Sequence, residues 1–231
     1  MLAIFPFITL PFNSCLTLVY YHQAENITTP PTLPIRQAYA PPRHATNFAN
    51  YLWQAVEPLE VDWLIEQFNG WFREKNTILV RGEHEPEYFA PTDDEPAKIV
   101  FAHGFFASSL HEISHWCVAG KQRRLLNDFG YWYAPDGRSA EQQSNFEKVE
   151  IIPQAIECLL TLSCGKRFLV SQDNLFADFD TSQSTFAHDV REQALHFWQT
   201  GEKLPTDATT LLKKLAVLRP LPLNVAEIAK N

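Results

Sequence analysis

The segment FAHGFFASSLHEISHWC, residues 101–117, contains the pattern H-E-x-x-H within apolar spacing that predicts a helix. Residues four apart lie one above the other on the same helix face, so His111 and His115 can direct two imidazole nitrogens at one point. Such a pair is half of a divalent metal site. Glu112, which follows the first histidine, can approach the metal without binding it.

The ends of this helix are also indicated locally. Ser108 and Ser109 are N-cap candidates, and Ser109 with Glu112 fits the S-x-x-E capping box. Gly120, followed by basic residues, is typical of a helix C-terminus. The capping box leaves a structural alternative for Glu112, whose carboxylate would then only hold the helix start.

Two histidines need a third ligand to hold a metal firmly, and two glutamates are candidates. Glu147 and Glu150 precede an expected helix that has Pro153 in its first turn, since proline fits poorly in mid-helix. The backbone there could turn Glu150 inward, whereas Glu147 lies beside Lys148 and could face solvent. We predict Glu150 as the ligand, with Glu147 as the alternative. Both could instead be helix-start acids favoured by the macrodipole.

The remaining pattern predicts an α+β fold. We expect a small mixed sheet, a metallopeptidase-like metal-binding helix, a second ligand helix and a helical C-terminus. The expected helices cover residues 61–74, 185–200 and 206–218, and the expected strands cover residues 77–81, 98–102 and 168–171. Residues 82–96 are expected to be an acidic loop, with His103 in the loop after the second strand.

Composition divides the chain into two parts. Residues 1–58 hold eight of the sixteen prolines but only four charged side chains. We expect a poorly ordered, proline-rich extension over residues 1–57 and a single metal-dependent domain over residues 58–231. The apolar first twenty residues lack the basic start of a signal peptide and contain two prolines, so they predict neither an export signal nor a membrane span.

Charge and cysteine content narrow the function classes. The net charge of −8 argues against nucleic-acid binding and is compatible with a cationic substrate. The four cysteines have no C-x-x-C spacing and no disulfide-framework density, which favours a reduced, cytoplasmic chain. Cys117, two residues after His115, would point away from the histidine pair and is expected in the core.

Three kinds of function fit two histidines and one carboxylate. With zinc, Glu112 would be the general base of a metallopeptidase or another hydrolase. With Fe(II), the same ligands form the facial triad of non-haem oxygenases, whose open positions take O₂ and substrate. If a fourth protein ligand closed the shell, the metal would be structural in a non-catalytic, partner-binding protein.

Two longer runs carry a family resemblance. The runs IVFAHGFFASSLHEISHWCVAGKQRRLLNDFGYWYAPDGR (99–138) and QSNFEKVEIIPQAIE (143–157) resemble the elongation factor P hydroxylase family. The resemblance covers roughly residues 60–218, and residues 1–57 have no counterpart in that family. Because these runs are long and rich in tryptophan, histidine and glycine, they are far more specific than H-E-x-x-H alone.

The resemblance implies an Fe(II)- and O₂-dependent enzyme that hydroxylates the β-lysylated lysine of elongation factor P. It implies His111 and His115 as ligands, with Glu150 as the carboxylate, and Glu112 falls on the family's glutamate. The usual 2-oxoglutarate oxygenases present H-x-D and a distant histidine on a jelly-roll barrel. Here both histidines share a helix, so 2-oxoglutarate is not assumed as the co-substrate.

Overall fold

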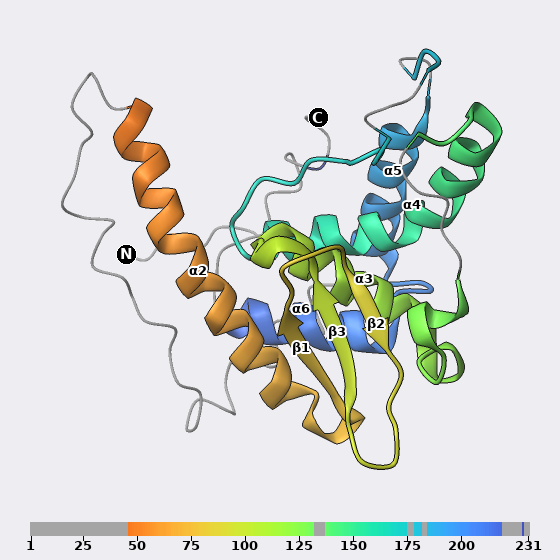
Figure 1. Ribbon diagram of the computed structural model, residues 1–231. Coiled ribbons are helices and arrows are strands. Elements are labelled where there is room, and N and C mark those ends of the chain that lie inside the picture. The colour runs from red at the N-terminus through yellow and green to blue at the C-terminus, as the bar shows by residue number, and fades with distance from the viewer. Residues whose placement is uncertain (1–45, 132–136, 175–177, 182–183, 219–227, 229–231) are drawn as a thin grey trace, which may run out of the picture.

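The computed structural model describes residues 46–131, 137–174, 178–181, 184–218 and 228, with side chains from residue 57 on. The predicted α+β class is confirmed, with a helical C-terminal part (Figure 1). The elements in chain order are α2 (Thr46–Trp71), η3 (Arg73–Lys75), β1 (Thr77–Arg81), β2 (Glu87–Phe89), β3 (Ala97–Phe101), η4 (Ala102–Gly104), α3 (Phe106–Arg123), η5 (Asn127–Gly130), α4 (Ala140–Ser163), α5 (Phe186–Thr200) and α6 (Thr206–Leu218).

The sheet is mixed and small, with strand order β1-β3-β2. β1 runs parallel to β3, and β2 runs antiparallel to it. Both edges have side-chain partners: the backbone N–H of Leu79 in β1 donates to Oδ1 of Asn69 at 2.7 Å, and that of Tyr88 in β2 donates to Oδ1 of Asp128 at 3.0 Å. These contacts occupy edge donors that could otherwise pair with another chain.

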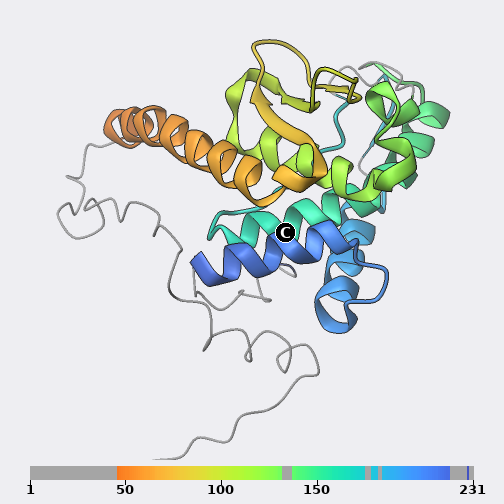
Figure 2. The same ribbon diagram turned by 90° about the horizontal axis from the view of Figure 1, so that it is seen from below.

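The helix α3 lies at the centre of the fold. It contacts β3 and α2 as well as α4 and α6, and α5 and α6 pack against α4. Figure 2 shows α4 and α6 side by side, with the sheet on the other side of α3. Trp116 anchors α3, because its fully buried ring meets edge-on the rings of Phe68 in α2 and of Phe72, which directly follows α2, at centroid distances of 5.3 and 5.0 Å. The metal-motif helix is therefore held from several sides.

Three expectations about the elements are wrong. The predicted loop at residues 82–96 contains β2, because Tyr88 is buried and its hydroxyl donates to the Arg124 carbonyl at 2.8 Å. Residues 168–171 form no strand, since the Ser171 N–H donates to the Gln154 side chain of α4 and not to a neighbouring strand. The first helix begins at Thr46, well before residue 61, and accommodates Pro58 in its interior.

The N-terminal expectations fall partly outside the described residues. Residues 1–45 lie there, and α2 crosses the expected boundary at residue 57. Within the part of the chain that is described, no helix combines the length and apolarity needed to span a bilayer. The expected helices at 185–200 and 206–218 agree with α5 and α6, and Gly201 ends α5 in the left-handed conformation at φ 66°.

Candidate metal centre

A tight turn connects β3 to the metal-motif helix. His103 and Gly104 have φ values of 51° and 70°, so the chain turns sharply before α3 begins at Phe106. An added Cβ at Gly104 would lie 2.7 Å from Nη1 of Arg81, which donates to the Gly104 carbonyl at 3.2 Å. His103 is exposed, and the structure does not group it with His111 and His115.

The start of α3 differs from the predicted capping box. Ser109 lies inside the helix, and its hydroxyl donates to the Phe106 carbonyl at 2.6 Å. The first helical N–H, that of Phe106, instead donates to the Glu57 carboxylate of α2 at 3.1 Å, and Ser108 accepts from the Ala102 N–H. A carboxylate from a distant segment thus takes the place of a local cap. At Gly120, the glycine predicted to end the helix, the backbone is non-helical (φ 66°, ψ 179°), and a further helical turn follows this kink to Arg123.

The two histidines converge as predicted. Nε2 of His111 and Nε2 of His115 lie 3.0 Å apart across one turn of α3. Two nitrogens bound to one metal at about 2.1 Å each lie about 3 Å apart, so the spacing suits a shared cation. The His111 side chain retains 29% exposure and that of His115 retains 13%, which leaves the pair reachable from solvent.

The helix α4 supplies the third group, but from its middle. It begins after Ser139, whose side chain and that of Gln142 form a reciprocal capping box. Pro153 therefore lies deep inside α4, and the prediction that it occupies the first turn is wrong. The local cap decided the helix start, and proline removes only one backbone donor in a helix that other elements hold by packing.

Glu150, and not Glu147, approaches the histidines. Its Oε1 lies 3.2 Å from Nε2 of His115, and its Oε2 lies 3.7 Å from Nε2 of His111. The carboxylate is 1% exposed. Glu147 instead accepts from the Ser184 hydroxyl at 2.9 Å and from the Gln143 amide at 3.2 Å. One nitrogen or oxygen from each of His111, His115 and Glu150 can be chosen so that all lie within 4.8 Å of one another.

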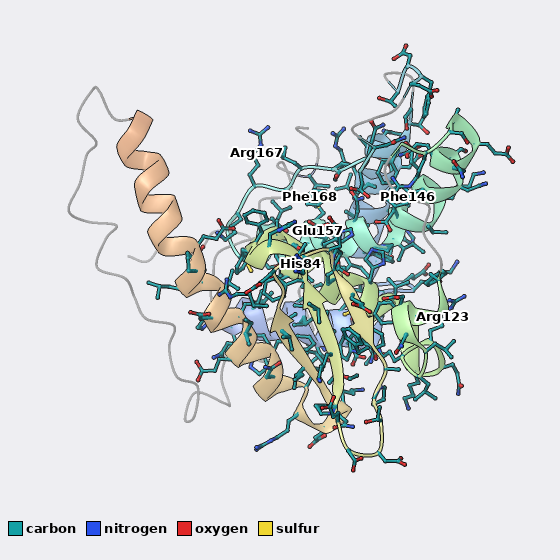
Figure 3. All side chains as sticks on the ribbon, viewed as in Figure 1. His84, Arg123, Phe146, Glu157, Arg167 and Phe168 are labelled. Carbon is teal, nitrogen blue, oxygen red and sulfur yellow. The ribbon has the colours of Figure 1, made fainter. Side chains whose placement is uncertain are left out.

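A second glutamate of α4, which sequence reasoning missed, contacts His111 at the ring nitrogen that does not face His115. Oε2 of Glu157, which Figure 3 labels, lies 2.8 Å from Nδ1 of His111. A sequence signal existed: α4 has polar residues spaced alternately by four and three, and most of these side chains are buried against its neighbours. They are Gln143, Glu147, Glu150, Gln154, Glu157 and Thr161.

The histidines and glutamates at the centre shift one another's pKa values. Burial by itself would lower the pKa of His111, but the hydrogen bond and charge of Glu157, with the charges of Glu112 and Glu150, raise it to about 10. Burial would raise the pKa of Glu150, but the neighbouring histidines and Gln154 hold it at about 2. The carboxylate of Glu150 is therefore ionised at neutral pH.

Glu112 is the carboxylate of this group that remains available. It is half-buried, and among the described residues it has no hydrogen-bond or ion-pair partner. Burial raises the pKa of Glu112, although the charges of His111 and His115 oppose this. Three glutamates around two histidines leave an excess of negative charge that a divalent cation would offset. Imidazole and carboxylate donors of this kind fit Fe(II) or zinc.

The family described as elongation factor P hydroxylase matches residues 67–222 of the chain. This chain belongs to the elongation factor P hydroxylase family. It is 49% identical over 154 residues to the elongation factor P lysine hydroxylase of Haemophilus influenzae, an alignment that covers 66% of this chain and 85% of the relative. The resemblance predicted from residues 99–138 and 143–157 is confirmed, and the chain is a hydroxylating enzyme by family.

Proposed function

We propose that this protein hydroxylates a lysine side chain of elongation factor P, in its β-lysylated form, at a metal centre held by His111, His115 and Glu150. The observation that carries the proposal is the convergence of these three groups from two helices in a chain of this family. The name of the Haemophilus relative supplies the protein substrate. Since that substrate is a translation factor, we place the enzyme in the cytoplasm.

The ligand set suits Fe(II), because two imidazoles and one carboxylate leave coordination positions open for O₂ and substrate. When bound, Fe(II) would supply the activation of O₂ for insertion of one oxygen atom into a lysine C–H bond, while a two-electron reductant converts the second oxygen atom to water. The protein residues would hold the metal. The ionised carboxylate of Glu150 faces the Nε2 atoms of both histidines, and Gln154 donates a hydrogen bond to Glu150 at 3.4 Å.

We further propose that Glu112 contacts the substrate. Its carboxylate adjoins the histidine pair, is half-buried and has no hydrogen-bond partner among the described residues, so it can accept a hydrogen bond from an ammonium group. A β-lysylated lysine carries such ammonium groups. The net charge of −8 favours approach of a cationic side chain to this protein.

The test is the mass of elongation factor P that has been co-expressed with its β-lysylating enzymes and with this protein. We expect a gain of one oxygen, about 16 Da, on the modified lysine peptide with the wild type. The gain should be absent with His111→Ala/His115→Ala. The matched control is His188→Ala/His196→Ala, which removes two exposed histidines of α5 outside the centre and should retain the gain.

The hydrolase alternative makes a different prediction. With Glu112 as the general base of a zinc peptidase, the wild type would cleave peptides and Glu112→Gln would abolish cleavage while zinc stays bound. No oxygen gain from folded, iron-loaded wild type would overturn the hydroxylase proposal. Peptide cleavage in the same preparation would then support the alternative.

A further inference from the structure

We infer that Glu157 is a positioning residue for the metal centre, which orients the His111 ring and thereby sets the metal affinity. This inference rests on the metal centre proposed above. It assigns a role to a fourth side chain that would not touch the metal, and it explains how the more exposed of the two histidines is held in place.

The first support is the direction of the contact. Oε2 of Glu157 lies 2.8 Å from Nδ1 of His111, while Nε2 of the same ring faces His115 and Glu150. A carboxylate at Nδ1 accepts the ring N–H there and keeps that proton in place, so the proton that a metal would displace is the one on Nε2, and the Nε2 lone pair would then face the metal. The hydrogen bond therefore selects both the tautomer and the rotation of the ring.

The second support is the unequal burial of the two ligands. His115 keeps only 13% side-chain exposure, so close packing restricts its ring. His111 keeps 29% and has less packing to orient it. The Glu157 side chain is itself 11% exposed, which makes its hydrogen bond to His111 poorly accessible to competing water. The contact with Glu157 thus restricts the ring of His111, which burial restricts less than that of His115.

The third support is the placement of Glu157 on α4. It lies seven residues after Glu150, which is two helical turns, so both carboxylates face α3. One helix thus carries both the group expected to bind the metal and the group that orients a second ligand. The docking of α4 on α3 brings both into place in one step.

The experiment measures Zn²⁺ affinity of the full chain by competition with a chromogenic chelator. We expect Glu157→Ala to weaken binding about 10–100-fold, the range found when outer-shell partners of metal ligands are removed. Glu157→Gln should bind Zn²⁺ more tightly than Glu157→Ala, because the amide oxygen can still accept from Nδ1–H. Partial rescue by this variant separates positioning from loss of side-chain volume.

The matched control is Glu147→Ala. Glu147 is another glutamate on the same face of α4, but it bonds Ser184 and Gln143 and does not approach the histidines. It should bind Zn²⁺ within about threefold of the wild type. The thermal unfolding midpoint of each metal-free variant is measured in parallel. The loss of Zn²⁺ affinity in Glu157→Ala should be larger than the fraction of unfolded chain at the assay temperature explains.

Each outcome bears on the inference. Equal Zn²⁺ affinity in Glu157→Ala and wild type overturns it, as does an equal loss in Glu147→Ala. A wild-type chain that binds no Zn²⁺ overturns it together with the metal centre. A wild type that binds Zn²⁺ with the expected Glu157 dependence but adds no oxygen to elongation factor P overturns only the proposed function.

Discussion

Oε1 of Glu150 lies 3.2 Å from Nε2 of His115 and joins the middle of α4 to the metal-motif helix α3. Glu147, one turn earlier on α4, makes its contacts to Ser184 and Gln143 instead. The two glutamates lie on the same helix, but only Glu150 contacts the histidine pair. This difference allows the role of the carboxylate to be separated from the stability of α4.

The first prediction concerns these two glutamates. Glu150→Ala should lose bound Fe(II) and the oxygen gain on elongation factor P, because two imidazoles alone hold a divalent metal weakly. Glu147→Ala should keep both and lose about 1 kcal/mol of unfolding free energy, since it removes the hydrogen bond to Ser184. Metal content after gel filtration and urea unfolding check the pair. Full metal retention in Glu150→Ala would contradict the ligand assignment.

The second prediction concerns Gln154, which connects α4 to the segment after it. Its side chain accepts from the Ser171 N–H at 3.1 Å and donates to the Ser171 carbonyl at 2.8 Å. Gln154→Ala removes both bonds as well as the one that Gln154 donates to Glu150, and it should lower the unfolding free energy by about 1–3 kcal/mol. Hydrogen exchange should become faster at residues 171–173. Asn145→Ala, at an exposed position of α4, is the control and should leave exchange in that segment unchanged.

The third prediction concerns the anchor of α3. Trp116 is fully buried, and the Arg124 guanidinium lies 3.5 Å from the centre of its ring while pairing with Asp207 of α6 at 2.7 Å. Trp116→Ala should lower the unfolding free energy by about 3–5 kcal/mol through the cavity it leaves. Trp116→Phe should cost less. Urea unfolding measures both, and a loss below about 1 kcal/mol in Trp116→Ala would show that α3 is held without this ring.

The fourth prediction concerns thiol reactivity. Cys117, Cys158 and Cys164 are buried, and none of the three is in a disulfide. Burial raises the pKa of the Cys117 thiol, and it raises that of Cys158 to about 12. Because only the thiolate reacts, Cys117 and Cys158 of the folded protein should be modified far more slowly than a free thiol with a pKa near 8.5, both at pH 7 and at pH 9.

Cys15 lies outside the described residues, so this measurement uses the Cys15→Ser variant and a colorimetric disulfide reagent. All three remaining thiols should react promptly once the protein is unfolded in guanidinium. Fast reaction of the folded variant at pH 7 would contradict the buried placement of these cysteines in the structure.

Residue patterns that are local in the sequence predicted a large part of the fold. The H-E-x-x-H spacing placed His111 and His115 on one helix face, and α5 and α6 follow their sequence boundaries closely. Strands β1 and β3 were also expected within one residue of their observed bounds. These features depend on residues that are neighbours in sequence, where helical and strand periodicities carry the information.

Contacts between distant segments decided the rest. Glu57 of α2 caps α3 in place of the local Ser109 box. The start of α4 at Ser139, which places Pro153 inside the helix, is by contrast a local signal that the prediction missed. The choice of Glu150 over Glu147, and the contact of Glu157 with His111, depend on which face of α4 docks on α3. That docking follows from packing among α3, α4, α5 and α6, whose free energy is summed over residues far apart in the chain and has no counterpart in local spacing.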